Sequence, residues 1–151
     1  MRNMISTNED TRYGGCNMQE SHVVTCFLEH DNKILILQRS AKVGSYTECW
    51  AGISGYIEPG VDALDQAWQE INEEASLGQE QLELVKVGDT LEIPDDSLGK
   101  KWVVHPFRFR VQNPELIKID WEHNQFKWIE PEEIRDHVTV PGLYTAWERV
   151  Q

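Results

Sequence analysis

The sequence predicts a single α+β domain in which a mixed sheet is combined with a few helices. A chain of 151 residues has room for one hydrophobic core. Short β-branched and apolar runs, typical of strands, recur along it, and one segment clearly repeats its apolar residues at helical spacing. Hydrophobic residues make up 40% and charged residues 26% of the chain, which is the balance of a globular protein.

The first predicted elements are two strands of a hairpin. Residues 1–20 lack periodicity, so we expect a flexible leader there and a folded domain over residues 21–151. Residues 22–29 (HVVTCFLE) and 33–39 (KILILQR) are β-branched and apolar, which predicts strands. The Asp31-Asn32 pair between them supplies the turn chemistry of a hairpin.

A predicted helix follows an extended segment. Residues 50–57 (WAGISGYI) are extended, and two glycines within them indicate close backbone approach to a neighbour: Gly52 and Gly55. Asp62 is a good N-cap for a helix over residues 62–77, with Gly78 placed to end it. The apolar stripe of this helix consists of Leu64, Ala67, Trp68, Ile71 and Ala75.

Strands and then short helices are predicted after this helix. Strands are expected over residues 82–93, 101–111 and 125–129. Pro106 suggests an edge strand or a bulge, because proline cannot donate to a ladder. Pro131 is placed to open a short helix through about His137, and a last helix is expected over residues 143–150.

Charge limits the partners that the protein can bind. Fourteen Lys and Arg against 26 Asp and Glu give a net charge of −12, so the net field repels a nucleic-acid polymer. A small phosphorylated substrate can still bind an acidic protein through a divalent cation. The apolar stretches are far shorter than the roughly 20 residues that cross a bilayer, so we expect no membrane contact.

Cysteine usage indicates the compartment. The three cysteines lack CxxC spacing, so they support neither a disulfide framework nor a zinc clasp. The N-terminus has no basic segment followed by an apolar core, which predicts no secretory signal. We therefore expect a reduced, cytoplasmic protein. His105 and His123 also lack partners at ligand spacing, so we interpret them as strand and loop histidines.

Three glutamates cluster on the predicted helix. At 100° per residue, Glu70, Glu73 and Glu74 fall in a band about 100° wide on the flank away from the core. Like charges at these spacings cost a few tenths of a kcal/mol each, so folding alone gives little reason for them. Two interpretations stay open: a solvated acidic face, or a site for a divalent cation, which prefers oxygen ligands.

The cluster and the segment before it resemble the Nudix box of MutT-like hydrolases, G-x5-E-x7-R-E-U-x-E-E-x-G-U with U aliphatic. Six of the nine specified positions agree without a gap: Gly55, Glu70, Ile71, Glu73, Glu74 and Leu77. The runs KILILQRS and WAGISGYIEPG also look like family members, so the resemblance covers roughly residues 21–150. It implies an α/β/α sandwich with a Nudix-like mixed β-sheet between helices.

Three positions depart from the family pattern. Val61 stands where the family has Glu, Gln69 where it has Arg, and Ser76 where it has Gly. Gln69 can hydrogen-bond a carboxylate but brings no charge. Val61 removes one accessory carboxylate, and Ser76 is the mildest change because a helix end accepts Ser.

The resemblance implies a hydrolase that cleaves the diphosphate linkage of a nucleoside diphosphate derivative with Mg²⁺ (or Mn²⁺) and an activated water. It assigns metal binding to Glu70, Glu73, Glu74 and Gly55, and catalysis to Glu73, Glu74 and Glu122. Rivals of Glu122 are Asp95, Asp96, Asp120 and Glu92. The alternative function is a catalytically weak nucleotide-binding or sensor module; isomerase chemistry through Cys49 is disfavoured because its metal-binding histidines are missing.

Candidate substrate-binding residues lie outside the box. The resemblance suggests Arg39 for phosphate binding, and Trp50 and Trp102 could stack a base through their ring faces. For the two tryptophans, core packing is the alternative interpretation, as is an ordinary strand-end cation for Arg39. The identity of the nucleoside diphosphate derivative and the formation of a homodimer stay open.

Overall fold

The computed structural model describes residues 18–151. The expected leader therefore lies, apart from its last three residues, outside the described residues. The first strand, β1 (Gln19–His30), begins two residues before the expected start of the domain. Among the described residues, no helix is both long and apolar enough to cross a bilayer.

Eight strands form one mixed sheet around β1. The ladder runs in the order β3-β2-β1-β7-β5, with β4 beside β1, β6 beside β7 and β8 beside β2. Only β1 and β7 pair in parallel among the described strands; the other pairs are antiparallel. The remaining strands are β2 (Lys33–Arg39), β3 (Trp50–Ala51), β4 (Ile53–Tyr56), β5 (Leu82–Val87), β6 (Leu91–Asp95), β7 (Lys100–Val111) and β8 (His123–Ile129).

The predicted hairpin is confirmed by its turn. Asp31 and Asn32 both have left-handed backbone angles, with φ of 52° and 66°. Two consecutive residues with positive φ match the twist of the flanking strands, and Asn and Asp tolerate this conformation better than most residues. β1 and β2 therefore meet at the expected place.

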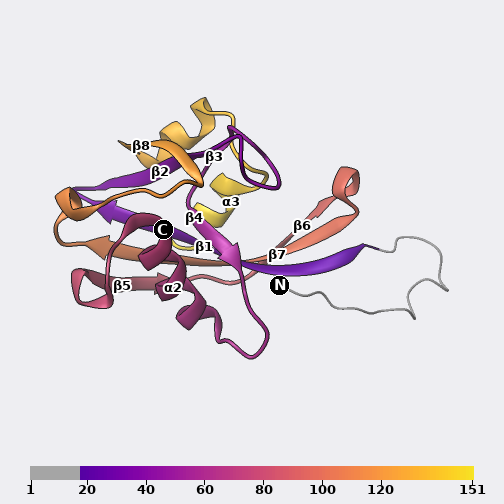
Figure 1. Cartoon of the computed structure of the whole chain (residues 1–151), viewed down its shortest axis with the longest axis horizontal. Coiled ribbons are helices and arrows are strands. Elements are labelled where there is room, and N and C mark those ends of the chain that lie inside the picture. The colour runs from indigo at the N-terminus through magenta and orange to yellow at the C-terminus, as the bar shows by residue number, and fades with distance from the viewer. Residues whose placement is uncertain (1–17) are drawn as a thin grey trace.

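Two helices cover opposite faces of the sheet, as Figure 1 shows, which confirms the α/β/α sandwich. Successive residues of β1 alternate between the faces: Val24 and Cys26 pack with α2 (Ala63–Ala75), whereas Val23 and Phe27 pack with α3 (Leu143–Glu148). Short 3-10 helices complete the chain: η1 (Gln79–Gln81), η2 (Asp96–Leu98), η3 (Pro114–Leu116) and η4 (Pro131–Asp136), the last being the helix predicted at Pro131.

The single strand predicted over residues 82–93 is wrong, because β5 and β6 are separate and pair with different halves of β7. The chain turns at Gly88, where a Cβ would lie 2.6 Å from the Arg149 carbonyl oxygen. Pro106 was expected at an edge or bulge, but β7 is central. Gly88 N–H donates to the Pro106 carbonyl at 3.0 Å. The nitrogen and the carbonyl of a strand residue point to the same side, so the Pro106 nitrogen, which has no hydrogen to donate, faces the gap between β5 and β6.

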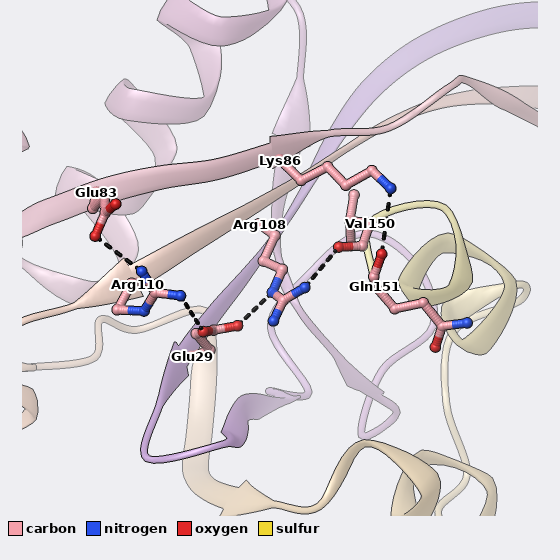
Figure 2. Close-up of polar contacts among 7 residues, drawn as sticks. All are labelled: Glu29, Glu83, Lys86, Arg108, Arg110, Val150 and Gln151. Carbon is pink, nitrogen blue, oxygen red and sulfur yellow. Dashed lines mark hydrogen bonds and ion pairs between the residues drawn. The ribbon is translucent and has the colours of Figure 1, made fainter.

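A network of charged side chains fixes the C-terminal end of the chain (Figure 2). The buried Glu29 carboxylate accepts a hydrogen bond from Arg108 and pairs with Arg110 at 3.2 Å. Arg108 also donates to the Val150 carbonyl at 3.1 Å, and Lys86 donates to the Gln151 carbonyl at 3.3 Å. The segment after α3 is therefore attached to β5 and β7.

The helix α2 ends earlier than predicted. Asp62 is the N-cap, and its side chain accepts from Leu64 N–H at 3.1 Å, as expected. The last helical residue is Ala75, and Ser76, not Gly78, adopts the left-handed cap conformation with φ of 64°. This conformation favours glycine. The Ser76 hydroxyl lies 3.1 Å from the Lys118 carbonyl, a hydrogen bond that partly offsets the cost.

We expect Ser76→Gly to be about 1 kcal/mol more stable than Ser76→Ala. Both variants lose the hydroxyl, so their difference isolates the cost of a Cβ in the left-handed region. Urea unfolding of the two proteins measures this difference. Equal stabilities would show that the cap carries no backbone strain.

Candidate active site

The three box glutamates occupy different environments on α2. Glu73 is exposed, Glu70 is half-buried, and the side chain of Glu74 is only 2% exposed. The expectation that all three lie on the flank away from the core is therefore wrong for Glu74. Glu74 is at the edge of the acidic band nearest the apolar stripe, where Cys26 of β1 and His123 of β8 lie beside it.

Gly55 and Gln66 hold the Glu70 carboxylate. A Cβ at residue 55 would overlap this carboxylate, so the close approach predicted at Gly55 is to Glu70. Gln66 Nε2 donates to Glu70 Oε2 at 2.8 Å, and Gln66 Oε1 accepts from Glu58 N–H at 3.1 Å. Burial raises the pKa of Glu70, although its contacts with Glu74 and Gln66 act in the opposite direction. Sequence reasoning missed Gln66, which is fully buried on α2.

Gln69 connects two carboxylates. Its Nε2 donates to Glu73 Oε2 at 3.2 Å and reaches Glu58 Oε2 at 3.5 Å. The predicted hydrogen bond from Gln69 to a box glutamate is therefore present, without the charge that Arg would add. Glu58 also lies close enough to Glu70 to raise its pKa.

The structure brings Glu122 and Arg39 to this cluster. Burial raises the pKa of Glu122, as do the charges of Asp120, Glu70 and Glu73, whereas the Arg39 charge lowers it. The Glu122 carbonyl accepts from Ser40 N–H at 2.7 Å, which fixes its loop beside the end of β2. Arg39 pairs with His123 across the β2–β8 ladder.

His123 and Asp120 also belong to the site. The ring of His123 is 3% exposed; its Nδ1 lies 3.2 Å from Asp120 Oδ1, and its Nε2 lies 3.6 Å from Glu74 Oε1. Sequence reasoning placed His123 in a loop without a role. Its position directly after Glu122 was the available signal, but the contact with Glu74 joins residues 49 positions apart.

Glu74 is suited to a cation. Burial raises its pKa strongly, and the contact with Glu70 and the charges of Glu70, Glu122 and Asp120 add to the effect. Its Oε2 is buried and has no hydrogen-bond partner. A buried carboxylate oxygen without a donor is costly unless a cation binds it. Mg²⁺ prefers oxygen ligands, which the glutamates provide.

The residues 18–151 contain no three His, Cys, Asp or Glu side chains that converge in ready-made ligand geometry. The assignment of a cation site therefore depends on the Glu74 oxygen and on the space that Gly55 leaves beside Glu70.

Trp50 and Trp102 lie away from the carboxylate cluster, in the packed environment of the alternative interpretation; their role in substrate binding stays a prediction. The register places them on the face that packs with α3, opposite α2. Lys127 Nζ lies 4.7 Å from the Trp50 ring centre, and Trp102 Nε1 donates to Tyr46 Oη at 3.0 Å. Tyr46 also donates to Asp95, which removes that rival of Glu122 from the cluster.

A surface hollow of about 380 Å³ lies away from this cluster. It is lined by residues of the β1–β2 turn and by Glu83 and Arg110. The carboxylate cluster is at the other end of β2, where Arg39 lies. The fold and the cluster together define a class: a mixed-sheet domain whose helix α2 carries a group of carboxylates of the kind that suits a divalent cation.

Comparison with known proteins identifies the family. The model of the NUDIX domain matches residues 18–147. An RNA pyrophosphohydrolase of Pelagibacter ubique (strain HTCC1062) is 32% identical in an alignment 128 residues long that covers 74% of this chain and 76% of that protein. The asymmetrical bis(5'-nucleosyl)-tetraphosphatase of Caenorhabditis elegans is 31% identical in an alignment 98 residues long that covers 62% of this chain and 70% of that protein.

Solved structures agree in fold. The C. elegans Ap4A hydrolase in a binary complex superposes with a TM-score of 0.68 at 22% identity, covering 86% of this chain and 93% of that one. The MutT protein of Methanosarcina mazei Go1 gives a TM-score of 0.72 at 19% identity, covering 86% and 91%. The chain belongs to the Nudix family. It is a hydrolase that acts on diphosphate linkages.

Replacing Glu74 by Gln is expected to stabilise the protein at neutral pH when no divalent cation is present. Because the folded-state pKa of Glu74 is raised, wild-type stability falls as pH rises above the unfolded-state pKa of about 4.3. Glu74→Gln removes this loss, roughly 1 to 3 kcal/mol. Urea unfolding at pH 7.5 should show the gain, and the gain should shrink at pH 4.

The control for this prediction is Glu73→Gln, which changes an exposed carboxylate and should alter stability little at either pH. Millimolar Mg²⁺ should then raise the melting temperature of the wild type by mass action, but not that of Glu74→Gln. An equal response of both proteins to Mg²⁺ would contradict a metal-binding role for Glu74.

Proposed function

We propose that this protein hydrolyses the diphosphate linkage of a nucleoside diphosphate derivative with Mg²⁺ (or Mn²⁺) held by Glu70, Glu73, Glu74 and the Gly55 carbonyl. The observation that carries this proposal is the buried Oε2 of Glu74, which has no protein partner and lies in a cluster of carboxylates. When bound, the cation neutralises the diphosphate and lowers the pKa of the attacking water.

The chain's own residues bind the substrate and move the proton. Glu122 is the proposed general base, because burial and neighbouring carboxylates raise its pKa toward the pH at which a base works best. Arg39, close enough to Glu122 to lower that pKa, is the proposed phosphate-binding residue. Glu73 is exposed and held by Gln69, so it can turn toward the cation with little structural change.

A small phosphorylated substrate fits the charge of the protein better than a nucleic-acid polymer. The net charge of −12 opposes a polyanion, whereas a bound cation reverses the sign locally. Because the Pelagibacter relative is an RNA pyrophosphohydrolase, the substrates tested must include the phosphorylated end of an RNA. The free thiols of Cys26 and Cys49 support the proposal of a reducing, cytoplasmic setting.

Turnover should be measured with Mg²⁺ on dinucleoside polyphosphates, ADP-ribose, nucleotide sugars and a 5'-triphosphorylated RNA. We expect hydrolysis of at least one nucleoside diphosphate derivative, and a drop of about 100-fold or more in Glu73→Gln and Glu74→Gln, because losing the cation costs several kcal/mol of transition-state stabilisation. Glu115→Gln, an exposed glutamate of η3, is the matched control.

Hydrolysis of the RNA alone would contradict the proposed substrate class. Full activity of Glu74→Gln would contradict the proposed site.

The alternative is a weak catalyst that mainly binds nucleotides, and Gln69 decides between the two. We expect Gln69→Arg to raise kcat about tenfold, since charge-assisted hydrogen bonds to Glu58 and Glu73 are roughly twice as strong as those of an amide. Gln69→Ala should lower kcat a few-fold. The binding module would be supported if the wild type bound nucleotides without turning them over and Gln69→Arg restored turnover.

A further inference from the structure

The loop between β2 and β3, residues 40–49, contains two non-glycine residues with left-handed backbone angles. Tyr46 has a φ of 50° and Glu48 a φ of 68°. A residue with a Cβ adopts this conformation at a cost, and the conformation persists only where surrounding contacts hold it. The loop directly follows Arg39, so its conformation affects the end of β2 that lies at the carboxylate cluster.

The hydroxyl of Tyr46 is held by two other strands. It donates to the Asp95 carboxylate at the end of β6 and accepts from Trp102 Nε1 of β7 at 3.0 Å. Burial and the contact with Asp95 raise the pKa of Tyr46 to about 12, so the hydroxyl keeps its proton and stays a donor at neutral pH. The two partners lie 49 and 56 positions from Tyr46 in the sequence. One oxygen atom therefore anchors the loop to a distant part of the sheet.

The same loop holds the Arg39 side chain. Arg39 Nε donates to the carbonyl of Ser45, the residue before Tyr46, at 3.0 Å. The Arg39 backbone also pairs with the loop, donating to the Cys49 carbonyl at 2.9 Å and accepting from Glu48 N–H at 2.8 Å. The side-chain contact uses Nε, so the two terminal nitrogens of the guanidinium can bind two phosphate oxygens at once.

The direction of the Ser45 carbonyl depends on Tyr46. The carbonyl and the Tyr46 nitrogen belong to one planar peptide group, so a fixed Tyr46 backbone fixes the carbonyl as well. Burial raises the pKa of Glu122 and the nearby Arg39 charge acts in the opposite direction, so the guanidinium lies near the proposed general base. An arginine that is held in place before the ligand arrives loses less side-chain entropy on binding it.

We propose that Tyr46 is a positioning residue for Arg39: its anchored hydroxyl fixes the peptide group between Ser45 and Tyr46, whose carbonyl holds the guanidinium beside the carboxylate cluster. The proposal rests on the phosphate-binding role proposed above for Arg39. It adds a residue outside the cluster on which that role depends. Tyr46 acts through Arg39 and is not itself a catalytic residue.

The first experiment observes the Arg39 side chain without a ligand. In nitrogen–proton NMR spectra, an arginine Nε–H that donates to a carbonyl exchanges slowly with water and gives a sharp signal, which Arg39→Lys identifies by its loss. We expect Tyr46→Phe, which removes only the hydroxyl, to broaden or abolish this signal. Tyr56→Phe is the matched control and should keep it, because Tyr56 also lies against the Trp102 ring but is not part of the loop.

The second experiment tests whether Tyr46 acts through Arg39, by calorimetric measurement of the Kd for ADP with Mg²⁺. We expect Tyr46→Phe to weaken binding about fivefold to tenfold, the net contribution of roughly one hydrogen bond, with the Kd for Mn²⁺ unchanged. Added to Arg39→Ala, the same Tyr46→Phe change should weaken binding by less than about twofold, because members of one network are not additive.

Further variants separate the anchor from the stability of the fold. Asp95→Ala removes the acceptor of the Tyr46 hydroxyl and should act like Tyr46→Phe. Ser97→Ala removes another side-chain partner of Asp95, at 2.6 Å, and should leave the Arg39 signal unchanged. Melting temperatures are measured on every variant. If Tyr46→Phe does not fold, the comparison of Asp95→Ala with Ser97→Ala decides.

Three results would overturn the inference. These are a wild type without a sharp Arg39 signal, a sharp signal that survives in Tyr46→Phe, and additive effects of Tyr46→Phe and Arg39→Ala on ADP affinity. If Arg39→Ala binds ADP as tightly as the wild type, or the wild type binds no ADP, the phosphate-binding role of the proposed function fails. The NMR comparison needs no ligand, so it still tests the contact between Arg39 and the loop, and the two failures are distinguishable.

Discussion

The forked pairing of β1 is the constraint on which the active site depends. One edge of β1 pairs with β7 from Gln19 to Glu29, but the other edge pairs first with β4 and then with β2. Gly52 allows the crossing, since a Cβ there would lie 2.9 Å from the Cys26 carbonyl oxygen. This fork places Gly55 of β4 against the Glu70 carboxylate. Arg39 of β2 and His123 of β8 lie opposite each other in the β2–β8 ladder and reach the cluster from there.

The cluster is unfavourable for folding and is supported by neutral groups. Glu70, Glu74 and Glu122 each have a raised pKa, chiefly because they are buried. The residues that restrain the carboxylates are largely uncharged: Gln66 binds Glu70, and Gln69 binds Glu73. Amides restrain them but leave the negative charge available to a divalent cation.

The fold was largely predictable because it depends on local patterns. Periodicity placed the first two strands and the helix, and the Asp31-Asn32 turn followed from residue type. The failures have long-range causes: the break at Gly88 comes from the approach of Arg149, 61 residues later. For the site, the box spacing located the three helix glutamates, and the family resemblance of a later segment suggested Glu122. The burial of Glu74 and the position of His123 beside it depend on β8 lying next to β2, which no local pattern reveals.

The departures from the Nudix pattern are local and leave the residues of the proposed cation site in place. Val61 removes a carboxylate, but Glu58, three residues earlier in the same turn, lies near enough to Glu70 to raise its pKa and contacts Gln69. Gln69 retains the hydrogen bond to Glu73 that the family arginine would strengthen. Ser76 affects the end of the helix, one turn beyond Glu73. Because each change alters the strength of a contact and none removes a ligand, metal binding should tolerate them better than the rate of hydrolysis does.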